Sequence, residues 1–235
     1  MVNMMKALVF TAPHTFEYRD VPRPEPAPDE VLVEVKACAI CGSDVHGSSG
    51  ENGRRIPPLV MGHEASGTIA QLGEAVQGWA VGDRVTFDST EYCGHCWFCT
   101  HGMHNLCAQR RIVGVACTEY RKNGAMAQYI AVKARTLYAL SPTVSFEQGC
   151  LVEPFAVGMH ARTIDFPLQR CITEQIDVQF SYSSAGEYPV CLQAIAEGRA
   201  DLTGLWQSFP LAEGAQVFDR LVHRDESLTK AVLIP

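Results

Sequence analysis

Apolar residues in the first half of the chain fall into short runs separated by proline and glycine. Proline gathers at 21–30, and directly afterwards Val31, Val33 and Val35 occupy every second position. Alternation with a period of two is typical of a β-strand that has one polar side. We therefore predict a strand over 31–36, and we expect other short apolar runs to behave in the same way.

Further strands are predicted at 65–72, at 83–87 after a Val-Gly-Asp turn, and at 125–132, with a last strand at 230–235 that would close a barrel. Short strands at irregular spacing, separated by glycine and proline turns, favour a small closed barrel. The fold class predicted from the pattern is mainly β with some α.

Helical periodicity is found near the end of the chain. Leu211, Ala215, Phe218 and Leu221 lie at helical spacing and would form one apolar face. We therefore predict a helix within 209–221.

Composition narrows the class of protein. The 235 residues are 47% hydrophobic, which is enough for one good core or two small ones. A net charge of −7 without a long basic run argues against nucleic acid or an anionic membrane as a partner. The sequence has neither an apolar run long enough to cross a bilayer nor the layout of a signal peptide, so we expect a cytoplasmic protein.

Four of the ten cysteines crowd together, in the spacing C-x₂-C-x₂-C-x₇-C. In a cytosolic chain such spacing indicates metal binding by reduced thiols rather than disulfides. Four thiolates fill a tetrahedron around Zn²⁺, which describes a structural site. An iron–sulfur cluster is the alternative, but the fourth cysteine is local and no proline follows it, so zinc is favoured. The four residues are Cys93, Cys96, Cys99 and Cys107.

A second group of candidate ligands combines Cys41 with His63 and Glu64. Three protein ligands with an open position describe a catalytic zinc site. His63 and Glu64 are neighbours and would point to opposite sides of a regular strand, so both reach one ion only if Gly62 lets the backbone turn. The alternative is a buried free cysteine, a satisfied histidine and a surface glutamate.

The motifs resemble those of the zinc-dependent medium-chain alcohol and polyol dehydrogenases, with the sorbitol and threonine dehydrogenase branch closest. The resemblance covers residues 1–161 and implies a GroES-like β-barrel catalytic domain with a zinc lobe at 89–110. Its motifs are Cys41-Gly-Ser-Asp-Val-His46, Gly62-His-Glu-Ala-Ser-Gly67, Val81-Gly-Asp-Arg-Val85, the four-cysteine lobe, Gly124-Ala-Met-Ala-Gln-Tyr129 and Glu153-Pro-Phe-Ala-Val157.

The resemblance also implies roles for individual residues. Cys41, His63 and Glu64 would hold the catalytic zinc, and Glu153 would be a fourth ligand or hold the zinc-bound water. Ser43 and His46 match the proton relay of the family, and we expect Ser43, His46 and Glu64 to be the catalytic residues. The four lobe cysteines would hold the structural zinc. A glutamate at position 153, where liver-type enzymes have cysteine, indicates the polyol branch.

The nucleotide-binding domain of the family is missing from the sequence. The sequence contains no G-x-G-x-x-G motif. Residues 175–182 nevertheless resemble the final strand of the nucleotide-binding domain, and residues 188–199 resemble the helix that follows it. We expect 162–199 to be the junction and remnant, and 200–235 to return to the catalytic domain. The deletion would be engineered or natural, or a segment of a longer protein would have been left out of the sequence.

The expected function is the substrate and zinc half of an NAD(P)-dependent alcohol or polyol dehydrogenase that oxidises a secondary alcohol to a ketone. We expect two Zn²⁺ per chain, a small alcohol or polyol as substrate, and no turnover without the cofactor domain. The alternative is a zinc-stabilised GroES-like module for oligomerisation or binding, with relic metal sites. An exposed edge at 176–181 would favour a homo-oligomer.

Overall fold

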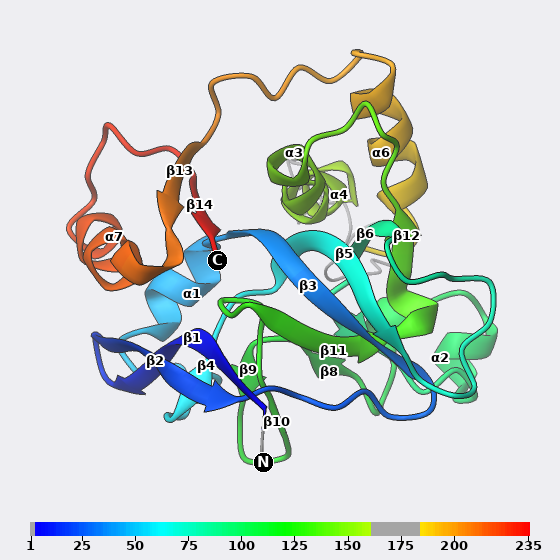
Figure 1. Cartoon of the computed structure of the whole chain (residues 1–235), viewed down its shortest axis with the longest axis horizontal. Coiled ribbons are helices and arrows are strands. Elements are labelled where there is room, and N and C mark those ends of the chain that lie inside the picture. Colours follow the sequence, from blue (N-terminus) through cyan, green and yellow to red (C-terminus); the bar gives the residue numbers. More distant parts are fainter. Residues whose placement is uncertain (1–2, 161–183) are drawn as a thin grey trace, which may run out of the picture.

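The computed structural model describes residues 3–160 and 184–235, and this part of the chain is mainly β with some α (Figure 1). The longer strands are β1 (Met4–Ala12), β2 (Thr15–Pro22), β3 (Glu30–Ala39), β5 (Glu64–Leu72), β6 (Arg84–Phe87), β11 (Tyr129–Lys133), β12 (Leu137–Ala139), β13 (Gln207–Pro210) and β14 (Ala231–Ile234). The two-residue strands are β4 (Leu59–Val60), β7 (Thr90–Glu91), β8 (Arg111–Ile112), β9 (Val115–Ala116) and β10 (Arg121–Lys122). The predicted fold class is confirmed.

Half of the described strands belong to one seven-stranded sheet. Its order is β12-β6-β5-β3-β14-β13, and β11 also pairs with β3. β3 is the central strand, because it pairs antiparallel with β5, β11 and β14 over different parts of its length. Its Val31, Val33 and Val35 are buried, as the alternation predicts, but Leu32 between them is buried as well.

A smaller sheet, β2-β1-β4, closes over the same core. Two backbone hydrogen bonds join it to the segment before β11, from Leu8 N to Met126 O and from Gln128 N to Lys6 O. The space between the two sheets is filled by a continuous cluster that includes Phe10, Ile69 and Phe87, each at most 1% exposed. The two sheets therefore share one core.

The described helices are α1 (Gly42–Gly47), α2 (Trp97–Thr100), α3 (Phe146–Cys150), α4 (Val152–His160), α6 (Tyr188–Ala196) and α7 (Gly214–Val222). Three of them, α3, α4 and α6, form a layer on the other face of the large sheet, whereas α7 packs on the core between the two sheets and α2 lies between β7 and β8. Figure 1 shows α3, α4 and α6 together above β5 and β6. A second apolar cluster joins Ala37, Ala39 and Val232 of the sheet to these three helices. Ser145 caps α3 through a capping box with Gln148, which fixes where this layer begins.

The chain beyond the helix layer returns to the sheet. A 3₁₀ turn, η3 (Leu211–Glu213), leads into α7, and the predicted apolar face is present because Leu211 and Phe218 are each 1% exposed. β14 then enters the large sheet between β3 and β13. The predicted last strand is therefore present, as an internal strand of this sheet.

Some of the other predicted elements are present at the expected residues and others are not. The strands at 65–72 and 83–87 and the helix at 188–199 are present as β5, β6 and α6. The strand at 125–132 was placed too early: β11 begins at Tyr129, and residues 125–128 are held by isolated backbone bonds. The predicted strand at 175–182, with its oligomer edge, lies outside the described residues.

Among the residues that the structure describes, none of the helices is both long enough and apolar enough to span a lipid bilayer.

Candidate metal centre

Candidate metal ligands gather at two places in the described part of the chain, the first of them a lobe between β7 and β8. The chain leaves the sheet after β7, turns through α2 and the 3₁₀ turn η1 (His104–Leu106), and returns at β8. Gly94 and Gly102 have positive φ angles, which allow the tight turns of so short a lobe. The ligand atoms of its four cysteines lie within 4.8 Å of one another: Cys93, Cys96, Cys99 and Cys107.

The sulfur–sulfur distances in the lobe fit a tetrahedral ion. Cys96 Sγ lies 3.5 Å from Cys99 Sγ and 3.9 Å from Cys107 Sγ, and the Cys93–Cys99 distance is 3.9 Å. Four sulfurs at a Zn–S distance of about 2.3 Å would be separated by about 3.8 Å. Backbone N–H groups of Cys93, Cys96 and Gln109 also point at lobe sulfurs, at 3.3–3.4 Å. The donor set therefore fits Zn²⁺.

Acidities in the lobe are consistent with a thiolate site. The backbone N–H groups of Cys99 and Ala108 lower the pKa of Cys96 to about 6. Burial raises the pKa of the Cys99 thiol to about 12 when no cation is present. Crowding several thiolates is unfavourable without a positive charge between them. A divalent cation would supply that charge.

The second cluster forms where α1 and β5 meet. Cys41 caps the N-terminus of α1, where its Sγ accepts a hydrogen bond from Ser43 N. Glu64 is the first residue of β5 and His63 directly precedes it, and the ligand atoms of all three residues lie within 4.8 Å of one another. His63 and Glu64 are buried and Cys41 is half-buried. The three predicted ligands are thus brought together.

Gly62 makes this convergence possible, as the sequence predicts. Its φ is +92°, a conformation that residues with a Cβ rarely adopt. A Cβ at this position would lie 2.7 Å from Cys38 Sγ and 2.8 Å from Met126 Cγ. The backbone therefore turns here, in tightly packed surroundings, between β4 and the adjacent pair His63-Glu64.

We expect Gly62→Ala to lower the free energy of unfolding by about 2–4 kcal/mol, because left-handed strain adds to overpacking. Urea unfolding followed by circular dichroism measures this loss. Gly158→Ala is the matched control: it lies in α4 with nothing within 4 Å of an added Cβ, so it should stabilise by up to about 1 kcal/mol. Equal stability of the Gly62 variant and the wild type would contradict our account of the turn.

Asp44 holds His63 from behind. Its carboxylate is fully buried, with Oδ2 3.5 Å from His63 Nδ1 and Oδ1 2.9 Å from Arg55 Nη2. Burial opposes the charge, but His63 and Arg55 prevail and lower the pKa of Asp44 to about 2. The same contact raises the pKa of His63 although burial lowers it. Since Asp44 faces Nδ1, Nε2 is the ring nitrogen available to a metal.

Glu64 and Glu153 differ in their positions. Glu64 Oε2 lies 2.6 Å from Lys230 Nζ, just before β14, and Oε1 is buried without a hydrogen-bond partner. Glu153, in the first turn of α4, is not one of the three residues gathered within 4.8 Å. Burial raises its pKa to about 7, and the charges of His63 and Glu64 also act on it. Glu153 therefore lies near the cluster and outside its inner group.

Ser43 and His46 lie on α1, three residues apart, so they share one face of the helix. Both side chains are exposed. Ser43 Oγ accepts a hydrogen bond of 3.5 Å from Arg55 Nη2. Their place beside Cys41 agrees with the predicted relay, and its operation remains a prediction.

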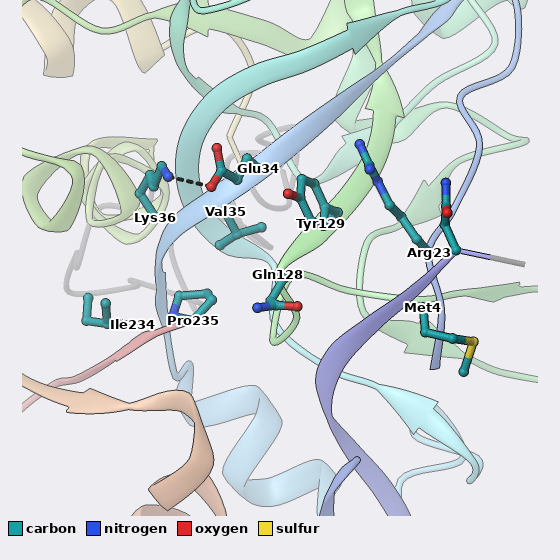
Figure 2. A pocket seen from close by; sticks show the side chains of 10 residues that line it. Met4, Arg23, Glu34, Val35, Lys36, Gln128, Tyr129, Ile234 and Pro235 are labelled. Carbon is teal, nitrogen blue, oxygen red and sulfur yellow. Dashed lines mark hydrogen bonds and ion pairs between the residues drawn. The ribbon is translucent and has the colours of Figure 1, made fainter. Parts of the chain in front are cut away.

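Figure 2 shows a different cavity, of about 400 Å³, on the outer side of β3 and β11. Arg23, Lys36 and Gln128 are among its lining residues, with Arg23 stacked on the Tyr129 ring at 4.1 Å. It contains neither cysteine cluster. The metal-ligand chemistry therefore lies elsewhere.

Sequence reasoning missed three residues of this centre: Asp44, Arg55 and Lys230. Asp44 lies inside the Cys41–His46 motif, but nothing in the sequence indicates that its carboxylate is buried. Arg55 and Lys230 reach the centre only through the fold, from a loop after α1 and from the residue before β14. A single lysine or arginine beside an apolar run does not show in the sequence which carboxylate it will contact.

Proteins of known family resemble this chain in sequence. Residues 27–142 match the family model of the alcohol dehydrogenase GroES-like domain. The chain is 36% identical over 164 residues to D-arabitol-phosphate dehydrogenase of Enterococcus avium, covering 68% of this chain and 45% of the relative. It is 32% identical over 199 residues to sorbitol dehydrogenase of Bacillus subtilis, covering 83% and 53%. The chain spans about half the length of the curated relatives it matches.

Solved structures share the fold. 2R,3R-butanediol dehydrogenase from Bacillus subtilis superposes with a TM-score of 0.79 at 18% identity, covering 98% of this chain and 99% of that one. A dehydrogenase from Sinorhizobium meliloti 1021 with NADP bound gives 0.81 at 20% identity, covering 99% and 100%. The family model, the curated relatives and the two clusters of metal-ligand residues together lead to one conclusion: the chain carries the GroES-like domain of the zinc-dependent alcohol and polyol dehydrogenase family.

Proposed function

We propose that this chain is the substrate-binding and zinc-binding half of an NAD(P)-dependent dehydrogenase that oxidises a secondary alcohol of a polyol to a ketone. The observation that carries the proposal is the convergence of Cys41, His63 and Glu64 within 4.8 Å. Relatives named for sorbitol and for arabitol phosphate support a polyol as substrate.

The proposed roles are zinc ligation and proton transfer. Cys41, His63 and Glu64 would hold the catalytic zinc, with Glu153 nearby as a fourth ligand or as the acceptor for a bound water. Zinc, when bound, lowers the pKa of a substrate hydroxyl and so favours loss of its proton. Ser43 would accept that proton and His46 would pass it to solvent, since an imidazole ring can both accept and donate a proton.

The lobe has a different part. Its four cysteines, Cys93, Cys96, Cys99 and Cys107, would hold a second zinc with no open position, so that ion would stabilise the lobe and bind no substrate. The sequence contains no G-x-G-x-x-G to bind the dinucleotide. We therefore expect this 235-residue form to bind zinc without turning over NAD⁺ or NADP⁺.

Metal analysis of the purified chain tests the proposal. We expect two zinc ions per chain, one of which a chelator removes readily, and Cys41→Ser should eliminate only that ion. NAD⁺-dependent oxidation of a polyol by protein of this mass would contradict the expected inactivity.

A second candidate is a zinc-stabilised module for binding or assembly, in which the first cluster is a relic. The observation that favours it is the 2.6 Å ion pair with Lys230, which occupies one oxygen of Glu64. A single, tightly held zinc in the wild type, unaffected by Cys41→Ser, would favour this module over the dehydrogenase.

A further inference from the structure

Lys230 brings a positive charge into the metal centre from the far end of the chain. It directly precedes β14, which Figure 1 shows beside β13, and its carbonyl oxygen accepts a hydrogen bond of 2.9 Å from Gln207 N. The carbonyl oxygen of the next residue, Ala231, accepts another of 2.9 Å from Ile40 N, and Ile40 directly precedes Cys41. The backbone that carries Lys230 is therefore fixed to the segment that carries a candidate metal ligand.

The ammonium group of Lys230 forms a short ion pair with Glu64. Its Nζ lies 2.6 Å from Glu64 Oε2, with the lysine side chain 19% exposed and the glutamate side chain 0%. Separating the two groups would leave a buried charge without a partner, which is costly because little water can reach it. The pair therefore keeps Glu64 Oε2 in place.

The two oxygens of Glu64 are unequal as a result. Oε2 faces Lys230, whereas Oε1 is buried and has no hydrogen-bond partner within residues 3–160 and 184–235. Buried polar atoms in native proteins are rarely left unpaired. Glu64 also belongs to the three ligand residues gathered within 4.8 Å. Oε1 is therefore the oxygen that remains for a metal ion.

The number of oxygens that Glu64 offers decides whether the centre can take a substrate. A carboxylate can bind a metal ion through one oxygen or through both. Zinc in a catalytic site has three protein ligands and keeps a fourth position for water or substrate. A second oxygen from Glu64 would compete for that fourth position. A cation that retains Oε2 would keep the position open.

We propose that Lys230 is a positioning residue of the metal centre, which retains Glu64 Oε2 and limits Glu64 to one oxygen at the ion. This rests on the proposed function, in which Cys41, His63 and Glu64 hold zinc. The role requires a cationic side chain at position 230. Arginine would keep a cation there, whereas methionine would keep an apolar stem of similar length and remove the charge.

A crystal structure of the zinc-loaded wild type tests the proposal without any substitution. We expect Glu64 Oε1 at about 2.0–2.2 Å from the ion, with Lys230 Nζ still in contact with Oε2. Zinc bound to both oxygens of Glu64, or Lys230 turned away from Glu64, would overturn the proposal.

Competition for the open position tests it in solution. Co²⁺ replaces the chelatable zinc, and its visible spectrum reports the binding of imidazole, which is titrated at a pH where imidazole is neutral. We expect Lys230→Met to weaken imidazole binding by about tenfold or more, because the second oxygen of Glu64 then competes with imidazole. Lys230→Arg should restore the wild-type affinity. Lys36→Met removes an exposed ion pair of the same 2.6 Å, with Glu34, and as the matched control should leave the affinity unchanged.

A purely structural role for Lys230 predicts a different result. Lys230→Met would then lower the free energy of unfolding and leave imidazole affinity as in the wild type, which would overturn the proposal. Circular dichroism shows whether this variant is folded. If it does not fold, the structure of the zinc-loaded wild type decides the proposal by itself.

Failure of the proposed function can be recognised separately. Two zinc ions per chain, together with Glu64 bound through both oxygens, would overturn the role of Lys230 and leave the proposed function intact. A wild type that holds only the lobe zinc would overturn the proposed function, and the role of Lys230 with it.

Discussion

Replacement of Cys99 by serine is expected to reduce the zinc content from two ions per chain to one and to unfold the lobe. Cys99 is 6% exposed and its sulfur lies 3.5 Å and 3.9 Å from two other lobe sulfurs. The lobe has little apolar core of its own, and structural zinc contributes on the order of 10 kcal/mol to small metal-bound folds. Metal analysis and hydrogen exchange of residues 93–107 measure the two effects.

Cys117→Ser is the control for that experiment. Cys117 is a half-buried free cysteine outside both clusters, so its loss should leave both zinc ions and the exchange of the lobe unchanged. Retention of two zinc ions in the Cys99 variant would show that the thiol set does not act as a closed site. The lobe would then be held by its backbone turns alone.

Asp44→Asn is expected to lower the free energy of unfolding by about 3–5 kcal/mol. The substitution removes the charge that neutralises Arg55, whose side chain is 5% exposed and 2.9 Å from Asp44. A buried guanidinium without its partner is costly because little water can reach it. Urea unfolding of the metal-free protein measures the loss. Asp20→Asn, in an exposed pair with Lys6, should change stability by less than about 1 kcal/mol.

The same substitution has a defined pH dependence. The pKa of Asp44 is lowered to about 2 in the folded protein, below its unfolded value of about 3.9. The stability contributed by this shift is present above pH 4 and is lost as the pH falls from about 4 towards 2. The difference in stability between wild type and Asp44→Asn should therefore shrink over that range. A constant difference from pH 6 to pH 2 would show that Asp44 does not keep its charge.

Local pattern predicted much of the fold and of the site. The alternation of Val31, Val33 and Val35 identifies the central strand, because a half-buried strand repeats every two residues. Cysteine spacing identifies the lobe, because short loops bring their own ligands together. Gly62 could be singled out since adjacent ligands need a turn. In each case the structural cause lies within a few residues of the signal.

Contacts between distant segments could not be predicted in this way. The ion pairs of Asp44 with Arg55 and of Glu64 with Lys230 depend on how strands meet in the sheet. The sequence of residues 125–128 favours a regular strand. In the structure this segment lies against β1 and forms only isolated backbone hydrogen bonds and one bridge with it. The place of Glu153 outside the inner group likewise depends on the packing of α4. Domain boundaries and the role of each ligand stay predictions.

The internal position of β14 has a consequence for biosynthesis. A ribosome that has made residues 1–160 has supplied Cys41, His63 and Glu64, but it has not yet made the strand that lies between β3 and β13 or the cation that touches Glu64. Pairings over such long sequence separations form late and slowly. The emerging chain would thus expose the flank of β3 to other nascent polypeptides until translation is nearly complete, and chaperone demand should be greatest in that interval.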